Sequence, residues 1–248
     1  MQQFNKNADA YDAVRGKITY PEALYFSLAA RVPAHDAALD IGCGNGVSTG
    51  RLKAWFHHVE GCDHGDVLIE RARLNYPDLL FSVSPAESYF PRRRFDLVTS
   101  ATSFYWMDRV RVLANLRDWL NPGGVFCAYK YDFPVVYGPL RDFIETELVD
   151  SWLYHRDPRL IQYDNTLELM DDCDYLVDCQ REVFSNILFL TPPEIAQFFL
   201  STSYVTRYVK AEGGKDYAAW FMAAVCEREP AEKAAVNFDI HAFTATLR

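Results

Sequence analysis

The stretch Ala38-Leu39-Asp40-Ile41-Gly42-Cys43-Gly44-Asn45-Gly46 decides the fold of this chain. A short apolar run ends in the acid Asp40, glycines follow at positions 42, 44 and 46, and residues 47–55 can continue as a helix. A strand, a tight glycine turn and a helix in this order open a nucleotide-binding βαβ unit. Glycine lets the backbone turn sharply and lets a ligand approach the main chain without meeting a Cβ atom. The N–H groups at the start of the helix add a partial positive potential.

The spacing of the glycines distinguishes between two ligands. A dinucleotide-binding turn of the form G-x-G-x-x-G would place its third glycine at position 47, where this chain has Val47. This departure weakens the prediction of a nicotinamide dinucleotide. The acid at the end of the strand suits a cationic ammonium group, which S-adenosylmethionine has in its methionine part. A glycine turn without any ligand is the alternative, and the agreement of acid, spacing and strand argues against it.

The segment 38–46 resembles the first motif of the class I S-adenosylmethionine-dependent methyltransferases, and the chain resembles in particular the methyltransferase type 11 group with the trans-aconitate methyltransferases. The resemblance covers most of residues 4–248; it is strongest at 37–46 and 121–128 and weakest at 130–180. It implies an α/β, Rossmann-like fold with a mostly parallel seven-stranded sheet, an antiparallel last strand and helices on both faces. It also implies S-adenosyl-L-methionine as the cofactor and S-adenosyl-L-homocysteine as the product.

Further cofactor contacts are expected from the second strand and from the N-terminal segment. Residues 58–63 predict a strand that ends in Asp63, and an acid at this distance from the first motif accepts hydrogen bonds from the ribose hydroxyls. A helix cap is the alternative role for Asp63. The segment 11–20 resembles a lid of the trans-aconitate group, which would bring its tyrosine and arginine to the methionine end of the cofactor; simple packing of an amphipathic helix is an equal alternative. The predicted cofactor-binding residues are Tyr11, Arg15, Asp40, Gly42, Cys43, Gly44, Asn45, Gly46, Asp63, His64, Ala86, Glu87 and Ser100.

Residues 84–87, Ser-Pro-Ala-Glu, resemble the adenine segment of the family. Pro85 stands where an acid is common, so the side-chain acceptor for the adenine amino group is missing. The backbone N–H of Ala86 can still meet the adenine ring. Glu87 is equally suited to cap a helix.

An aromatic segment follows the predicted fourth strand, residues 95–100. The sequence Ser103-Phe104-Tyr105-Trp106-Met107-Asp108 resembles a segment of the same group in which histidine often stands at the position of Tyr105. Open α/β sheets bind ligands at the carboxyl ends of their strands. Tyr105 and Trp106 are therefore expected on the acceptor side, as walls of the methyl-transfer pocket. A hydrophobic cap on the next helix is the alternative.

The remaining pattern predicts helices over 21–32, 108–120 and 217–225 and strands over 80–83, 125–129 and 182–190. Residues 121–124, Asn-Pro-Gly-Gly, predict a turn, and residues 191–194, Thr-Pro-Pro-Glu, predict a capping box at a helix start. Alternation over 236–242 predicts a final antiparallel strand at the sheet edge. The chain is expected to be one methyltransferase domain, 1–248, with an N-terminal lid over 1–34 and a helical substrate-side insertion over 130–181. Candidates for an acceptor pocket in the insertion are Trp152, His155, Arg156 and Arg159. For each charged residue taken singly, a solvated side chain at a helix end is the favoured alternative.

Composition narrows the class of partner. The 248 residues have a formal net charge of −9, which argues against nucleic acid as a partner. The six cysteines form no C-x-x-C pair and have no zinc-type spacing, so we expect free thiols, no metal site and a reducing, cytoplasmic location. No run of about 18 apolar residues suggests a membrane span. The oligomeric state stays open.

The function expected from the sequence is transfer of a methyl group from S-adenosylmethionine to a small-molecule acceptor, such as a carboxylate or a hydroxyl oxygen. Besides a nicotinamide dehydrogenase, which lacks its third glycine at position 47, two alternatives remain. One is a non-catalytic protein that binds S-adenosylmethionine. The other is a methyltransferase acting on tRNA or protein, which would show a basic stripe on its surface.

Overall fold

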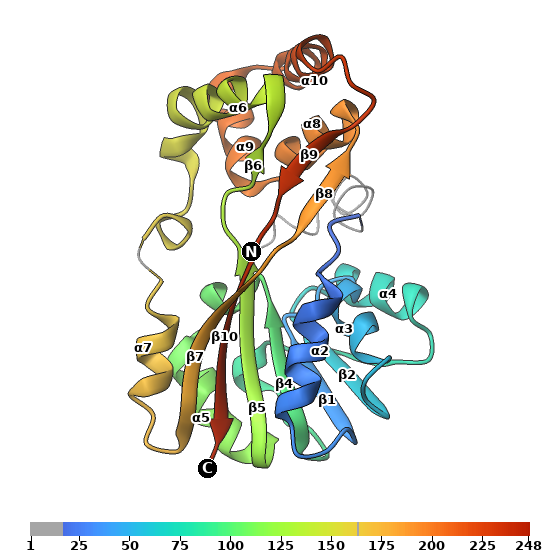
Figure 1. The fold of residues 1–248 in the computed structure, drawn as a ribbon, viewed down its shortest axis with the longest axis vertical. Helices are drawn as coiled ribbons and strands as arrows, with labels where there is room; N and C mark the ends of the chain where they lie inside the picture. Colours follow the sequence, from blue (N-terminus) through green and yellow to red (C-terminus); the bar gives the residue numbers. More distant parts are fainter. Residues whose placement is uncertain (1–16, 163) are drawn as a thin grey trace. The chain divides into compact units, whose positions relative to one another are not determined.

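The computed structural model describes residues 17–162 and 164–248. These residues fall into two compact units, and each unit is built from several segments of the chain (Figure 1). Unit 1 contains residues 17–18, 132–162 and 185–239, and unit 2 contains residues 19–131, 164–184 and 240–248. The predicted insertion, 130–181, is thus shared between the two units. A single domain with a lid and an insertion stays a prediction.

Unit 2 is built on a seven-stranded sheet with the strand order β3-β2-β1-β4-β5-β10-β7. All neighbours are parallel except that β10 is antiparallel to both β5 and β7. This arrangement confirms the predicted fold, a mostly parallel sheet with an antiparallel last strand. The strands are β1 (Ala37–Ile41), β2 (His58–Asp63), β3 (Leu80–Val83), β4 (Phe95–Ala101), β5 (Leu120–Tyr131), β7 (Leu176–Phe184) and β10 (Ile240–Leu247).

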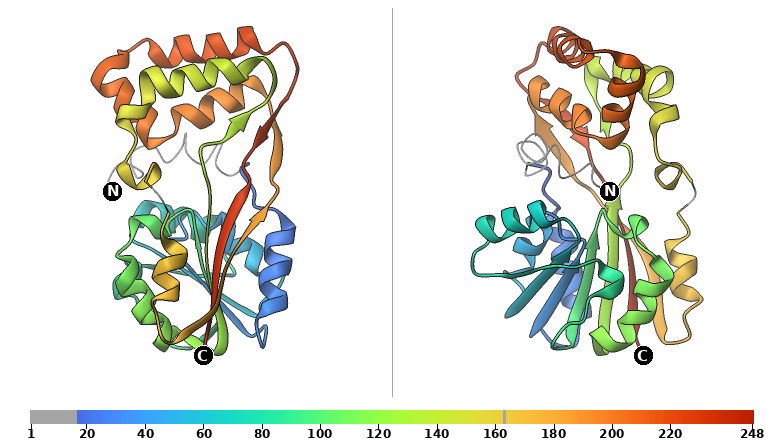
Figure 2. Two further views of the ribbon diagram at one scale, coloured as in Figure 1. Left: turned by 60° about the vertical axis from the view of Figure 1, so that its left-hand side comes forward. Right: turned by 180° about the vertical axis from the view of Figure 1, so that it is seen from behind.

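Helices cover both faces of this sheet (Figure 2). The helices α2 (Glu22–Arg31) and α3 (Val47–Leu52) pack on one face, and α5 (Arg109–Trp119) and α7 (Thr166–Asp171) pack on the other. The helix α4 (Asp66–Asn75) packs against β3 through Ile69 and Ala72. Every residue of β1 and β4 is buried, as expected for central parallel strands covered on both sides.

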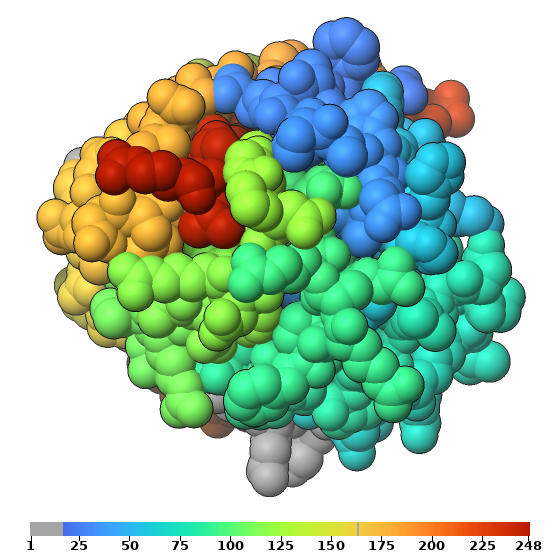
Figure 3. All heavy atoms as spheres, turned by 90° about the horizontal axis from the view of Figure 1, so that it is seen from below, coloured from blue at the N-terminus to red at the C-terminus, as the bar shows by residue number. Residues whose placement is uncertain are grey.

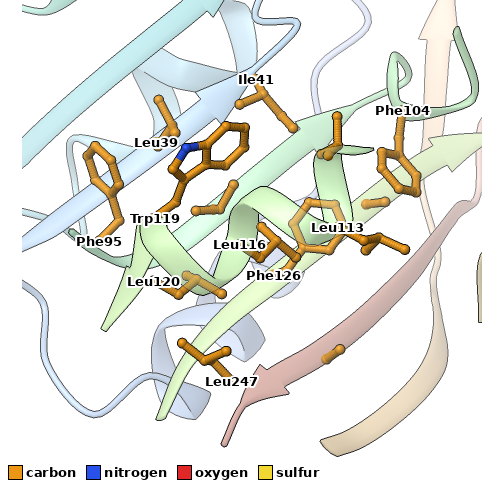
Figure 4. Packing of buried hydrophobic residues seen from close by; sticks show 14 of the residues in the cluster. Leu39, Ile41, Phe95, Phe104, Leu113, Leu116, Trp119, Leu120, Phe126 and Leu247 are labelled. Atoms are coloured by element: carbon orange, nitrogen blue, oxygen red, sulfur yellow. The ribbon is translucent and has the colours of Figure 1, made fainter. Parts of the chain in front are cut away.

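The core beneath α5 shows how the predicted helical pattern is used. Leu113, Leu116 and Trp119 lie on one side of α5 and are at most 2% exposed. Figure 4 shows these side chains beside Leu39 of β1 and Phe126 of β5. Burying side chains of this size against a sheet contributes about 1.5–3 kcal/mol each. The apolar face that the sequence periodicity predicted for α5 is therefore the face that packs on the sheet and stabilises the helix.

Two strands predicted as continuous are each divided in the structure. Within the first, residues 182–190, β7 ends at Phe184 and a new strand, β8 (Ile187–Leu190), follows. The second, residues 236–242, is divided between β9 (Ala234–Asn237) and β10. The strands β8 and β9 form a separate antiparallel sheet with β6 (Val135–Val136) in the order β6-β9-β8. At the break, the N–H of Asn186 donates to Asp239 Oδ1 at 2.9 Å, and the N–H of Phe238 donates to the carbonyl of Asn186 at 2.8 Å. Asn and Asp offer such local partners and so interrupt a strand ladder.

The last strand is not at the edge of the sheet, contrary to the sequence-based prediction. β10 lies between β5 and β7, and β7 forms the edge. Figure 3 shows the same order from the end where the chain finishes, with the red C-terminal residues between orange and light-green segments. The backbone N–H of Arg248 donates to the carbonyl of Tyr175 at 3.0 Å and fixes this end of β10 beside the segment before β7. Residues 175–184, which pair with β10, are far away in the sequence. The alternation of residues 236–242 could not predict this pairing.

The predicted turn at residues 121–124 lies within the assigned strand β5. The pairing of β4 with β5 moves from Phe95–Leu120 to Leu97–Val125, so extra residues of β5 bulge out at this point. Gly123 has a φ of +75° there, a conformation that glycine adopts without strain. The sequence thus predicted an irregular backbone at residues 121–124, but it did not predict that these residues lie within a strand.

Unit 1 combines the small sheet with helices around an aromatic core. Trp152 is fully buried; its ring stacks on Phe199 at 5.4 Å, and its Nε1–H donates to the Tyr217 hydroxyl at 2.9 Å. Trp152 is therefore a core residue and does not line an open pocket.

No helix within the described ranges is long and apolar enough to cross a membrane. The longer helices of this unit are α6 (Arg141–Glu147), α8 (Pro192–Leu200), α9 (Ser203–Tyr208) and α10 (Tyr217–Arg228), and the short 3-10 or π turns are η4 (Gly138–Leu140), η5 (Leu148–Trp152), η6 (Leu153–His155), η7 (Pro158–Leu160) and η8 (Val209–Gly213).

Candidate functional site

The glycine turn connects β1 to α3 as the sequence predicted. Gly42, Gly44 and Gly46 have φ angles of +65°, +55° and +86°, all in the left-handed region. The turn is pinned to the neighbouring strand, because the N–H of Gly42 donates to the carbonyl of Cys62 at 2.7 Å. Such a backbone path is strained for any residue with a Cβ atom, and it explains why glycine recurs at every second position.

The three glycines differ in what surrounds them. A Cβ atom on Gly42 would lie 2.5 Å from Ser103 Oγ, and one on Gly46 would lie 2.9 Å from Tyr76 Cδ2. A Cβ atom on Gly44 would have nothing within 4 Å. Gly42 and Gly46 are thus required by close packing, whereas Gly44 faces open space. The main chain at Gly44 is where a ligand can come into contact with the turn.

Asp63 stands beside this open glycine. Its carboxylate accepts the N–H of Gly44 on Oδ2 at 3.0 Å and the N–H of Gly65 on Oδ1 at 2.7 Å. The residue is 7% exposed, and the neighbouring His64 is exposed with its Nδ1 3.3 Å from Asp63 Oδ1. A carboxylate oxygen has two acceptor sites, so each oxygen of Asp63 can accept another hydrogen bond. This carboxylate is rigidly held and suits a pair of neighbouring hydroxyls.

Asp40 lies deeper, beneath the turn. It is fully buried, and its two oxygens accept hydrogen bonds from Thr49 Oγ1 at 2.7 Å and Thr99 Oγ1 at 2.9 Å. Burial raises the pKa of Asp40 to about 6, although the Thr49 and Thr99 hydroxyls act in the opposite direction. The carboxylate therefore ties β1 to α3 and β4. Its contact with a cofactor ammonium stays a prediction.

The end of β4 touches the glycine turn. Ser100 is fully buried, its hydroxyl lies 2.8 Å from Ser103 Oγ, and Ser103 Oγ donates to the carbonyl of Ile41 at 3.2 Å. The two strands β1 and β4 are adjacent and parallel, so their carboxyl ends meet here. Ser100 is thus placed at the same edge as the turn, as the sequence predicted.

The predicted adenine segment forms a short 3-10 helix, η2 (Ala86–Ser88). Ala86 is buried, and the Glu87 carboxylate accepts the N–H of Asp108 at 2.8 Å at the start of α5. Glu87 therefore has the capping role that the sequence gave as one of two options.

Cys43 and Asn45 are buried in the turn, and burial raises the pKa of the Cys43 thiol. Tyr11 and Arg15 lie outside the described residues.

The aromatic segment begins directly after this edge, as η3 (Phe104–Trp106). Phe104 is buried against Phe126 with ring centroids 5.2 Å apart. Tyr105 and Trp106 are only partly buried, and their rings lie 5.1 Å apart. The segment thus anchors itself with one aromatic side chain and presents two others beside the carboxyl ends of β4 and β5.

The comparison with protein families gives one match, between residues 39–128 and the model of a methyltransferase domain. These residues run from β1 to β5 and include the glycine turn, Asp63 and η3. These residues are therefore similar to a methyltransferase domain, and the sheet that they help to form has the class I methyltransferase fold. The chain is 34% identical over 131 residues to a trans-aconitate 2-methyltransferase of Methylobacterium radiotolerans, covering 51% of this chain and 49% of the relative. It is 29% identical over 138 residues to a dTDP-4-amino-2,3,4,6-tetradeoxy-D-glucose N,N-dimethyltransferase of Saccharopolyspora spinosa, covering 52% and 55%. The chain spans about half the length of the curated relatives it matches.

The fold is also similar beyond the methyltransferase domain. The structure of a proposed type II methyltransferase from Anaeromyxobacter dehalogenans superposes with a TM-score of 0.72 at 24% identity. The match covers 91% of this chain and 96% of that one. Segments outside residues 39–128 therefore belong to a fold that another protein shares.

Unit 2 has further polar residues that the sequence did not identify, outside the range 39–128. A pocket of unit 2 lies beside η3, at the carboxyl end of β5, next to Phe243 of β10 and the start of α7. In it, Lys130 Nζ lies 2.8 Å from Asp164 Oδ2, and Thr166 Oγ1 donates to Asp164 Oδ1 at 2.6 Å. Although burial favours protonation, the Lys130 and Thr166 hydrogen bonds hold the pKa of Asp164 below its usual range. A lysine directly after the apolar run 125–129 was the available signal. The pocket is lined by Phe104, Tyr105, Ala128, Tyr129, Lys130, Asp164, Thr166 and Phe243.

Proposed function

We propose that the protein transfers a methyl group from S-adenosylmethionine to a small-molecule acceptor. The observation that carries the proposal is the pairing of Gly44 with Asp63. The Gly44 N–H is fixed by the Asp63 carboxylate at 3.0 Å, and the direction in which a Cβ atom would point is open. An adenosyl ligand needs both features, close approach to the main chain and a carboxylate for its ribose hydroxyls.

The residues present fit this cofactor. Gly44 gives access to the turn, Asp63 would accept from the ribose, and the buried Ala86 follows the strand next to Asp63, where its N–H could meet the adenine. The sulfonium supplies an activated methyl group, so no covalent protein nucleophile is needed. Asp40 would keep the glycine turn fixed, because its carboxylate accepts hydrogen bonds from α3 and β4.

The acceptor side would orient the attacking atom and exclude water. Ser103 connects the glycine turn to η3, so Tyr105 and Trp106 follow within a few residues of the cofactor side. Holding two reactants in line can contribute about 7–11 kcal/mol in favourable cases. The names of the relatives give trans-aconitate for one and an amino sugar for another. For this chain we propose an oxygen acceptor, a carboxylate or a hydroxyl, on a small molecule.

Calorimetric titration with S-adenosylhomocysteine tests the proposal. We expect the wild type to bind S-adenosylhomocysteine with micromolar affinity and to prefer it over NAD. Asp63→Ala should weaken this binding by about 1.5–3 kcal/mol, since a charged hydrogen-bond acceptor is lost. Asp63→Asn should lose less, because one amide oxygen can still accept.

The matched control is Glu60→Gln. Glu60 lies on the same strand as Asp63, but its carboxylate is engaged by Tyr89 at 3.0 Å and Arg93 at 3.6 Å, away from the turn. This variant should bind S-adenosylhomocysteine like the wild type. A wild type that prefers NAD, or that binds neither ligand, would overturn the proposed function. Release of S-adenosylhomocysteine from S-adenosylmethionine with a panel of acceptors then separates an enzyme from a binding protein.

A further inference from the structure

We propose that Thr102 is a positioning residue of the methyl-transfer site, and that its left-handed backbone conformation sets where Tyr105 and Trp106 lie relative to the glycine turn. Thr102 directly follows the last residue of β4 and stands two residues before the start of η3. This inference rests on the proposed function, because it concerns the acceptor side of the same site. It assigns a role to a residue that the sequence pattern did not single out.

The backbone of Thr102 is strained. Its φ angle is +52°, in the left-handed region, where the Cβ atom of an L-residue comes too close to the following carbonyl oxygen. A β-branched residue rarely adopts this conformation. Within residues 17–162 and 164–248, Asp178 is the other non-glycine residue with a positive φ, and aspartate tolerates such an angle far better. Strain of this kind persists only where the surrounding structure imposes it, and it is common at functional sites.

Contacts with β5 hold Thr102 on the side of the sheet. Its backbone N–H donates to the carbonyl of Tyr129 at 2.7 Å, directly after the pairing of Ala101 with Tyr129. Its hydroxyl lies 3.5 Å from the hydroxyl of Tyr20. The Tyr20 ring in turn meets the Tyr129 ring edge-on, with ring centroids 5.1 Å apart. The position of Thr102 is therefore fixed by the end of β5 and by the aromatic side chain that packs on it.

Contacts with the glycine turn hold the chain that leaves Thr102. Ser103 precedes η3, and its Oγ donates to the carbonyl of Ile41 at 3.2 Å. Met107 follows η3 directly. A Cβ atom on Gly42 would lie 2.5 Å from Ser103 Oγ and 2.7 Å from Met107 Cε, so both residues occupy the space beside this glycine. The segment η3 is thus packed against the turn at both of its ends.

The left-handed residue connects these two sets of contacts. With a negative φ at Thr102, the chain would leave β4 in another direction, and η3 could not keep both of its ends against Gly42. The turn and η3 are in direct contact, so a ligand that binds at Gly44 would also affect η3. Tyr105 and Trp106 would then be placed by the same contacts that shape the cofactor side.

Fluorine NMR of protein labelled with 5-fluorotryptophan tests this role. The chain has five tryptophans, and the Trp106→Phe variant identifies the resonance of Trp106. We expect one narrow Trp106 resonance in the wild type, which shifts when S-adenosylhomocysteine is added. The resonances of the other four tryptophans report whether each variant keeps the fold.

Thr102→Pro excludes the left-handed conformation, because the proline ring fixes φ at about −65° and removes the N–H that donates to Tyr129. We expect the Trp106 resonance to shift or broaden and its response to S-adenosylhomocysteine to be lost, while the other four resonances keep their wild-type positions. A residue that only stabilised the fold would instead lower the urea midpoint and leave the Trp106 resonance of the folded protein unchanged.

Two further variants separate the backbone conformation from the side chain. Thr102→Asn should retain the wild-type position and response of the Trp106 resonance, because asparagine adopts left-handed angles more readily. Thr102→Val keeps the β-branched shape and lacks the hydroxyl beside Tyr20, so it should broaden the same resonance to a smaller extent. The valine variant decides the test if the proline variant does not fold.

An unchanged Trp106 resonance in the valine variant and in a folded proline variant would overturn the proposal. An asparagine variant in which Trp106 is disturbed as in the proline variant would overturn it as well. Calorimetry with S-adenosylhomocysteine distinguishes this proposal from the proposed function. If the wild type binds no S-adenosylhomocysteine, the proposed function fails, while the ligand-free spectra still decide the role of Thr102. If S-adenosylhomocysteine binds and leaves the Trp106 resonance in place, only the present inference fails.

Discussion

Asp40 is fully buried in unit 2, where the hydroxyls of Thr49 and Thr99 donate hydrogen bonds to its carboxylate. The pKa of this carboxyl rises from 3.8 to about 6 because burial penalises the ionised form. Between these two values the folded protein keeps a proton that the unfolded chain has lost. The stability of the fold therefore decreases as the pH rises through this window and then levels off above it. Ionised Asp40 costs about 3 kcal/mol at neutral pH, at about 1.4 kcal/mol for each pH unit between the two pKa values.

We predict that Asp40→Asn removes this dependence on pH. An amide can still bond to the Thr49 and Thr99 hydroxyls, which both donate and accept. The difference in free energy of unfolding between wild type and variant should shift by about 3 kcal/mol in favour of the variant from about pH 4 to about pH 7. Urea denaturation at a series of pH values measures this difference. Asp142→Asn, which changes an exposed carboxylate on α6, is the control for the loss of one acidic group. A constant difference for Asp40→Asn would show that Asp40 is not protonated on folding.

Residues whose position at the site could be predicted and residues that were missed differ in one physical respect. Asp63 could be predicted because β1 and β2 are adjacent parallel strands, so acids at their ends must lie at one edge. Lys130 and Asp164 could not be paired, because their contact depends on where α7 packs, and no local pattern records that. A position fixed by neighbouring strands can be predicted from the nearby sequence. An ion pair between residues far apart in the sequence can be identified only once the whole fold is known.

At the scale of single elements, the start of α8 is set by its own sequence. Thr191 Oγ1 accepts the N–H of Glu194 at 3.4 Å, and the Glu194 carboxylate accepts the N–H of Thr191 at 2.9 Å. This reciprocal pair confirms the predicted capping box. Glu194 also pairs with Lys17, and the Lys17 hydrogen bond is the main cause that lowers the pKa of Glu194.

We predict that Thr191→Ala lowers the free energy of unfolding by about 1 kcal/mol, because one donor at the helix start loses its partner. Thr191→Ser retains the hydroxyl and is the matched control, with an expected loss of only a few tenths of that amount. Chemical denaturation of both variants at one pH measures the two losses. Equal losses for alanine and serine would mean that the threonine methyl group, and not the cap, stabilises this helix start.

The strands show where prediction from local pattern stops. The segments 80–83 and 95–100 were predicted almost to the residue because each is bounded by turn residues and pairs with neighbours of the same unit. The segment 182–190 alternates throughout, yet it serves two sheets. Alternation reports which side of a strand is buried but not which sheet buries it. The break at Asn186 depends on Asp239, which lies more than fifty residues later.

At the scale of the whole molecule, the main sheet was predicted from the resemblance to the class I methyltransferases, and the alternation of strands and helices in the sequence agrees with it. The division into two units could not be predicted in the same way. The chain passes between the units at residues 18–19, 131–132, 162–163, 184–185 and 239–240. Only pairing between distant segments defines such units, and composition hardly changes at these points.

The distribution of charge over the whole chain supports a last prediction, on the alternative of a tRNA methyltransferase. The formal net charge is −9, and the densest basic run is Arg92-Arg93-Arg94. Two of its members are engaged by the protein itself: Arg93 lies 3.6 Å from Glu60, and Arg94 donates to the carbonyl of Leu120 at 2.7 Å.

A chain of this charge has few cations with which to displace counter-ions from a phosphate backbone, so the usual driving force for nucleic-acid binding is weak. We therefore predict no binding of unfractionated tRNA at about 50 mM salt and about 10 μM protein in a gel-shift assay, conditions that favour even non-specific complexes. The control is the double variant Arg92→Glu and Arg93→Glu, which should behave like the wild type. Binding by the wild type that falls steeply with added salt and is lost in the double variant would instead identify residues 92–94 as a phosphate-binding surface. In that case a nucleic-acid acceptor would replace the small molecule.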